Sequence, residues 1–165
     1  MIYKKSWKYI LTRDNTDYCK DGYYRPKAVK DFSNISFGDL GGFVDGYYNL
    51  SQSGNCWIYN NSRVFDSACV SENAIVFDDA RVTDNAKVYG NAIISNYATV
   101  KENAIVCDNA KIYDVADVSG HAKVSGNAKV RGYAQVFENA VITDNADIRG
   151  FERIRGNTIK VEYDI

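Results

Sequence analysis

The chain has 165 residues, of which 45% are hydrophobic, and this length and composition fit one ordinary globular domain. Its 20 Lys and Arg residues nearly balance 21 Asp and Glu residues, so the net charge is −1. The balance excludes attraction to nucleic acid or to an anionic membrane through overall charge, and such a partner would need a local patch. No run approaches about 18 apolar residues, and the start lacks a stretch of signal-peptide length, so we expect a soluble cytoplasmic protein.

Residues 1–43 precede any repeat and are predicted to form a small N-terminal β cap. Two strand-like runs, 8–12 and 23–29, flank a polar stretch that ends in Asp21-Gly22, which is the pattern of a β-hairpin. A stacked fold must cover its open ends, because a terminal coil otherwise exposes core and unpaired backbone groups. We expect the hairpin to cover the N-terminal end.

Residues 58–159 carry a six-residue repeat. From Ile58 to Ile154 every sixth residue is Val or Ile, and from Ala68 to Ala146 the residue four positions later is Ala. The third residue of a hexad is usually Asp, Glu or Gly, and the fourth is usually Asn. Asn, Asp and Gly tolerate the left-handed backbone conformation that a tight bend requires. Each hexad is therefore predicted to be a short strand plus a bend, with two residues facing a thin core.

The bends predict how many hexads make one coil. A column of residues departs from Asn at intervals of 18: Tyr97, Val115, Tyr133 and Phe151. Three hexads per coil would stack equivalent bends vertically. The sequence thus predicts an all-β fold, a single-stranded parallel β-helix with three faces and about six coils over residues 44–159. Residues 160–165 are expected to form a C-terminal cap, with Val161, Tyr163 and Ile165 folding over the last coil.

The aliphatic, turn and small positions of the repeat resemble the hexapeptide-repeat left-handed β-helix family across residues 58–159. The left hand is implied by this resemblance alone, since general crossover rules favour the right hand. Residues 25–57, with Gly38-Asp39-Leu40-Gly41-Gly42 and Gly54-Asn55-Cys56-Trp57, are similar to the leader of a subgroup of bacterial and prophage proteins. Members of that subgroup are labelled acyltransferases or uncharacterised phage proteins. The resemblance implies a prophage origin and a place in the host cytoplasm.

The outward residues of the first face, which contains Ile58 and Val76, change character along the chain. Residues beside each inward aliphatic point outward. The apolar ones are Trp57, Tyr59, Ile75, Phe77 and, further on, Tyr113. A basic patch follows, made of Lys111, Lys129, Arg131, Arg149, Arg153 and Arg155. Either the N-terminal hairpin covers the apolar region, or it is an interface. The basic patch is either a solvated face or a site for phosphates or an acidic protein. The second face, which contains Val64, looks like a mixed surface suited to water.

The column of Tyr97, Val115, Tyr133 and Phe151 points to an interface with a protein partner or another copy of the chain. A bend gains nothing from Val or Phe, and we expect Val115 to be strained there in a left-handed conformation. Self-association would give a dimer or a trimer, and the family resemblance favours the trimer.

Few residues of the sequence are candidates for catalysis or metal binding. The resemblance implies coenzyme A-dependent acyl transfer with a catalytic His, and this chain has one, His121, at a bend in an uninterrupted repeat. His121 is either a general base or a tolerated turn residue. A single His excludes a multi-histidine zinc site. Asp66, Asp84 and Glu102 could attract a cation, but turn propensity explains them equally well.

The cysteines give no sign of a metal or disulfide site. The four cysteines show no paired spacing. Cys69 and Cys107 would lie two coils apart, about 9–10 Å, which is too far for a disulfide.

The preferred hypothesis is a non-enzymatic binding protein of phage or prophage origin, without cofactor or metal, that uses the aromatic column and the adjoining apolar and basic face. Inhibition of a host defence system would suit such a protein. The alternatives are a coenzyme A-dependent acyltransferase with His121 as base, and a self-assembling structural component of a phage.

Overall fold

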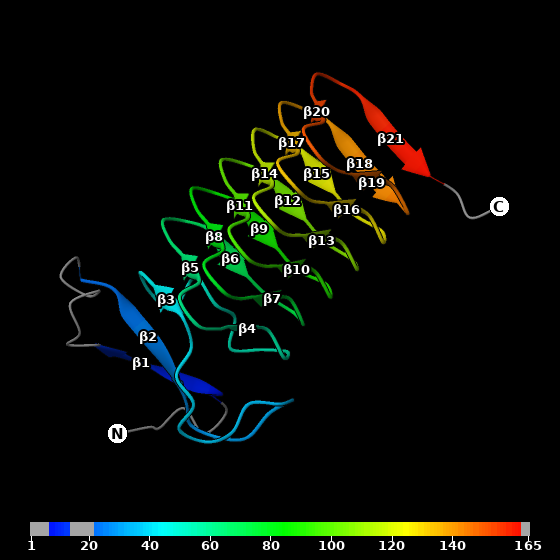
Figure 1. Cartoon of the computed structure of the whole chain (residues 1–165). Helices are drawn as coiled ribbons and strands as arrows, with labels where there is room; N and C mark the ends of the chain where they lie inside the picture. Colours follow the sequence, from blue (N-terminus) through cyan, green and yellow to red (C-terminus); the bar gives the residue numbers. More distant parts are fainter. Residues whose placement is uncertain (1–6, 14–21, 163–165) are drawn as a thin grey trace.

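The computed structural model describes residues 7–13 and 22–162. These residues form strands, turns and loops without a helix, and they wind into a left-handed parallel β-solenoid (Figure 1). Among them, no helix is therefore long and apolar enough to cross a membrane. The predicted all-β left-handed β-helix with an N-terminal hairpin is confirmed.

Each face of the solenoid is one sheet whose strands belong to successive coils. The first face contains β4 (Trp57–Ile58), β7 (Ile75–Val76), β10 (Ile93–Ile94), β13 (Lys111–Ile112), β16 (Lys129–Val130) and β19 (Asp147–Ile148). The second face contains β3 (Phe43–Val44), β5 (Arg63–Val64), β8 (Arg81–Val82), β11 (Thr99–Val100), β14 (Asp117–Val118), β17 (Gln135–Val136) and β20 (Arg153–Ile154). The third face contains β6 (Cys69–Val70), β9 (Lys87–Val88), β12 (Ile105–Val106), β15 (Lys123–Val124), β18 (Val141–Asp144) and β21 (Ile159–Glu162).

The core is a column of identical or nearly identical side chains. Val100 pairs with Val82 on one side and with Val118 on the other, and all three are 0% exposed. The small residue of each hexad, such as Ala98, is also fully buried. Because the cross-section is narrow, one branched and one small side chain per hexad fill it, which explains why the repeat tolerates so little variation at these positions.

Three bends close each coil, and we name them corner A (second to third face), corner B (third to first) and corner C (first to second). The left-handed residue of each bend is the third of its hexad, as at Asp66 (φ 54°) and Asp114 (φ 60°). Val115, the fourth residue of its hexad, has no positive φ, because Asp114 takes that conformation. The prediction that Val115 is strained in a left-handed conformation is therefore wrong.

Side chains at corners A and B tie one coil to the next. At corner A the N–H of Glu102 donates to Oδ2 of Asp84 (2.9 Å), and the N–H of Gly120 donates to Oε2 of Glu102 (2.6 Å). The carboxylates considered for a cation thus accept backbone N–H groups. At corner B the amides form a ladder of hydrogen bonds of 3.1–3.2 Å through Asn73, Asn91, Asn109, Asn127 and Asn145.

The N-terminal hairpin extends the sheet of the second face. Strand β1 (Tyr9–Arg13) pairs antiparallel with β2 (Tyr24–Ala28), and β2 pairs antiparallel with β3. Figure 1 shows both strands beside the first coils. Lys8, just before β1, is 2% exposed, and its Nζ donates to the carbonyl oxygens of Cys56 (2.8 Å) and Gly54 (3.3 Å). Burial lowers the pKa of Lys8 from its ordinary value. This side chain satisfies carbonyls at the first full coil.

The C-terminal end breaks the repeat with polar and charged residues. Ile148 and Ile154 are still 3% and 8% exposed, but β21 places Lys160 opposite the inward Ile142 of β18. Val161 is 36% exposed, while Tyr163 and Ile165 lie outside the described residues. The division into residues 1–43, 44–159 and 160–165 stays a prediction.

Cys56, Cys69 and Cys107 are free thiols, so the expectation that Cys69 and Cys107 do not bridge is confirmed. Burial raises the pKa of each of the three thiols. A raised pKa lowers the fraction of reactive thiolate.

Replacing Lys8 by Met should destabilise the fold, because the buried carbonyl of Cys56 and the partly buried carbonyl of Gly54 lose their donor while the volume is kept. We expect a loss of about 1–3 kcal/mol in the free energy of unfolding, measured by urea denaturation. The exposed Lys27→Met serves as the control and should change stability by less than about 0.5 kcal/mol. Equal midpoints and slopes for Lys8→Met and wild type would contradict the role given to Lys8.

Candidate functional site

Corner C exposes a column of apolar side chains over successive coils, which we call the apolar ridge. The ridge consists of Tyr97, Val115, Tyr133 and Phe151, with exposed fractions of 66%, 45%, 57% and 80%. The rings of Tyr133 and Phe151 stack with centroids 5.1 Å apart and planes 5° from parallel. The sequence column thus corresponds to one continuous exposed feature.

At the other two corners, the fourth residue of the hexad stabilises the fold by linking successive coils. The equivalent residues of corner B are the Asn ladder, and at corner A the amide of Asn85 donates to Asn103 (3.2 Å). Apolar side chains at corner C make no such hydrogen bonds between coils. The ridge therefore lacks the side-chain hydrogen bonds between coils that Asn forms at the same hexad position of corners A and B.

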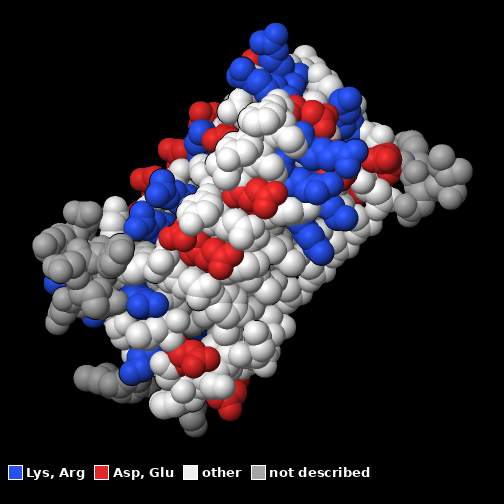
Figure 2. Space-filling view, in the orientation of Figure 1, with Lys and Arg blue, Asp and Glu red and all other residues white. Residues whose placement is uncertain are grey.

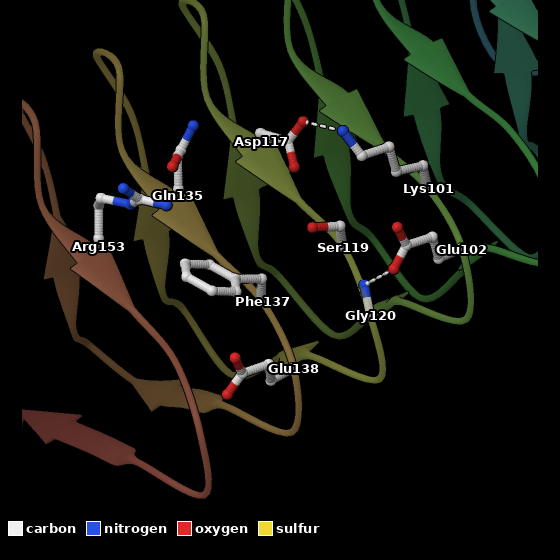
Figure 3. A pocket seen from close by; sticks show the side chains of 9 residues that line it. All are labelled: Lys101, Glu102, Asp117, Ser119, Gly120, Gln135, Phe137, Glu138 and Arg153. Carbon is white, nitrogen blue, oxygen red and sulfur yellow. Dashed lines mark hydrogen bonds and ion pairs between the residues drawn. The ribbon is translucent and has the colours of Figure 1, made fainter.

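A groove runs beside the ridge over β11, β14, β17 and β20 of the second face. Its volume is about 490 Å³, and besides the ridge it is lined by Thr99, Ala116, Asp117, Gln135 and Arg153. A second hollow of about 370 Å³ shares Asp117, Gln135 and Arg153 with it and continues across the face toward corner A (Figure 3). The two hollows make one shallow, elongated depression.

Sequence reasoning missed this depression, because it treated the second face as a mixed surface suited to water. Ser119 is shorter than Lys101 and Phe137, which stand at the same position in the coils before and after it. Short side chains between longer ones are the signal that could have revealed a hollow. The ring of Phe137 lies under the guanidinium of Arg153, with Cζ 5.4 Å from the ring centroid.

The basic patch divides between two faces on either side of the ridge. Lys111, Lys129, Arg131 and Arg149 belong to the first face, and Arg153 and Arg155 to the second. Arg149 and Arg153 flank the bend at Phe151, whereas Arg155 lies beyond Ile154 toward corner A. Figure 2 shows Lys and Arg side chains gathered toward the end of the solenoid that holds the last coils.

Two ion pairs neutralise the carboxylates of Asp117 and Asp147 on the faces that meet at the ridge. Arg131 donates to both oxygens of Asp147, through Nε (2.9 Å) and a terminal nitrogen (2.7 Å), and this pairing lowers the pKa of Asp147. Lys101 donates to Oδ2 of Asp117 at 2.6 Å, as Figure 3 shows. The first pair is bidentate, which fixes its geometry.

The apolar start of the first face is partly covered by the chain itself. Trp57 is 1% exposed and meets Tyr9 and Phe32 edge-on, with ring centroids 6.0 and 5.4 Å away. The hydroxyl of Tyr59 hydrogen-bonds Asn34 (3.1 Å). Trp57 therefore belongs to the core of the chain and is closed to a partner.

The rest of that region stays partly open. Ile75 and Phe77 are half-buried and border a shallow hollow of about 320 Å³, while Tyr113 is half-buried further along the face. These side chains are accessible, but far less so than those of the ridge.

His121 lies exposed at corner A, at the edge of the second face opposite to the ridge. Its backbone N–H donates to the carbonyl of Glu138 (2.6 Å), as the Asn at neighbouring positions does. The residues lining the 370 Å³ hollow include its neighbours Gly120 and Glu138 but not His121. Within residues 7–13 and 22–162, no group of His, Cys, Asp and Glu has the arrangement of a metal site. The surroundings of His121 are those of a turn.

Comparison with known proteins gives one partial match. No family model matches the chain. A stretch of 47 residues, 28% of the chain, is 43% identical to a protein of Escherichia coli (strain K12) named "Uncharacterized acetyltransferase YdcK", and it covers 14% of that protein's length. Together with the β-solenoid, this match fits a hexapeptide-repeat family.

Proposed function

We propose that this chain is a non-enzymatic binding protein that docks another polypeptide chain on its apolar ridge. The observation that carries the proposal is the exposure of Tyr97, Tyr133 and Phe151, at 57–80%, in a column where the other corners carry polar side chains. Burying an exposed Phe contributes about 1.5–3 kcal/mol, so a partner that covers several such side chains gains stability from each.

Folding does not account for the ridge. The left-handed conformation at each bend of corner C belongs to the preceding residue, for example Asp114 before Val115, so the ridge position needs no special side chain. Asn at the same position of corner B links successive coils by hydrogen bonds. Side chains that replace Asn at a cost to the fold are typical of residues kept for binding.

The partner is either a second copy of the chain or a different protein. The likeness of residues 25–57 to leaders of bacterial and prophage proteins supports a phage-encoded chain that binds a host protein, and inhibition of a host defence factor suits that role. A trimer is what the hexapeptide-repeat likeness supports for self-association.

Replacing Tyr133 and Phe151 together by Asn should abolish partner binding and leave the fold intact. Each ring at the centre of an interface contributes about 2 kcal/mol or more, roughly 30-fold in affinity. Molar mass by sedimentation, and the polypeptides retained from a bacterial lysate, are compared for this variant and the wild type, with circular dichroism to confirm folding.

The matched control replaces Asn85 and Asn103 of corner A by Ala, which removes one 3.2 Å hydrogen bond and leaves the ridge untouched. The control should behave as the wild type in both assays. An unchanged molar mass together with unchanged retention in the ridge variant would refute the proposal.

A second candidate is a hexapeptide acyltransferase with His121 as general base, favoured by the 47-residue match to a protein named as an acetyltransferase. This candidate predicts saturable binding of acetyl-coenzyme A and a fall of about 10²- to 10⁴-fold in transfer rate for His121→Ala. Asn139→Ala, one coil further along corner A, is the control.

Our preferred proposal predicts the opposite: titration calorimetry should detect no acetyl-coenzyme A binding, and thiol release should be the same for wild type and His121→Ala. Binding together with a rate loss confined to His121→Ala would replace the binding proposal by the enzymatic one.

A further inference from the structure

We infer that the segment docking on the apolar ridge is acidic, with aliphatic side chains between its carboxylates. The inference rests on the proposed binding function and names the chemistry of the partner. It follows from the charges beside the ridge, the orientation of its rings and the groove along it.

The charges beside the ridge include more cations than carboxylates. Asp114, in the bend before Val115, accepts the backbone N–H of Gly132 through Oδ2 (2.9 Å). Asp147 is held by Arg131 and Asp117 by Lys101, at 2.7 and 2.6 Å. Glu152 accepts the backbone N–H of Arg149 through Oε1 (3.1 Å). Within the described part of the chain, no carboxylate lies within 4.0 Å of the charged groups of Lys111, Lys129, Arg149 and Arg153. A partner that supplies carboxylates would complement these cations.

These cations surround the end of the ridge on both sides. Arg149 precedes the bend that carries Phe151 and Arg153 follows it, so one lies on each face that meets at corner C. Lys111 and Lys129 are paired neighbours on β13 and β16, one column further from the corner. An elongated acidic segment that follows the ridge can therefore reach cations on either side of it.

Two rings of the ridge, those of Tyr133 and Phe151, turn their edges outward because they stack on each other. Because Tyr133 and Phe151 stack almost parallel at 5.1 Å, the faces they turn toward each other are closed to a third ring. Ring edges carry the positive part of the aromatic quadrupole and attract carboxylates. Single-stranded nucleic acid binds by stacking bases on open ring faces, and the Tyr133–Phe151 stack closes one face of each of these two rings. The geometry favours an acidic polypeptide over a nucleic acid.

The groove supplies room for the apolar part of the partner. Its volume of about 490 Å³ is bounded by the ridge on one side, and Thr99 and Ala116 keep its floor low. Asp117 in the groove is already neutralised by Lys101, so it does not repel an acidic segment strongly. Aliphatic side chains can pack into the groove against the ridge while neighbouring carboxylates meet Arg149 and Arg153.

The test uses a fluorescein-labelled peptide in which pairs of Glu alternate with single Leu residues, and fluorescence anisotropy at about 0.15 M salt. A peptide with Lys in place of Glu, and an oligothymidine, are the competing probes. We expect the acidic peptide to bind the full chain at least tenfold more tightly than either. Replacing Arg149 and Arg153 together by Glu should weaken binding of the acidic peptide at least tenfold.

The matched control replaces Lys87 and Lys123 of the third face by Glu, which makes the same change in net charge on exposed residues away from the ridge. It should alter affinity less than twofold. Equal losses for both charge variants, no preference for the acidic peptide, or tighter binding of oligothymidine would each overturn the inference. The proposed function fails separately, when the variant of Tyr133 and Phe151 retains the same proteins and the same molar mass as the wild type.

Discussion

Vertical stacking of identical coils is the constraint on which this structure depends. Val82, Val100 and Val118 lie directly over one another, and the carboxylate of Asp84 or Glu102 accepts a backbone N–H one coil further on. A residue gained or lost within a strand would shift the inward column and the corner hydrogen bonds together, whereas the two extra residues of the first coil lie between Leu50 and Ile58 and leave Val44 opposite Val64. The inward positions and the left-handed bends are therefore fixed by folding.

The outward residues and the fourth residue of each hexad, which lies in the bend, are not fixed by folding in this way. Corners A and B use the latter for Asn, which ties the coils together. Corner C uses it for Tyr133 and Phe151, whose rings still stack in the coil register but turn an apolar edge to the outside. The rigid scaffold thus arranges exposed apolar groups in a line without loops, which reduces the entropy that a partner must overcome on docking.

Regular features of the fold could be predicted from the sequence, because each is repeated every 6 or 18 residues. The thin core, the three faces and the ridge all follow from that repetition. The strain assigned to Val115 was wrong, because the left-handed residue is the one before it; Gly132 and Gly150, at the same position of the next two coils, were the signal in the sequence that could have shown this. Contacts between residues far apart in the sequence could not be predicted either. Lys8 hydrogen-bonds Cys56, 48 residues away, and Trp57 packs against Tyr9 and Phe32, and no local sequence pattern indicates these contacts.

The groove was missed for a related reason, because its depth comes from side-chain lengths compared between coils rather than within one hexad. Tyrosine nitration tests most directly whether the ridge and groove form the binding surface. With the acidic peptide bound, Tyr97 and Tyr133 should react more slowly than in the free protein, while Tyr48, 61% exposed and away from corner C, should react at the same rate. Unchanged rates at Tyr97 and Tyr133, or equal slowing at Tyr48, would contradict this account.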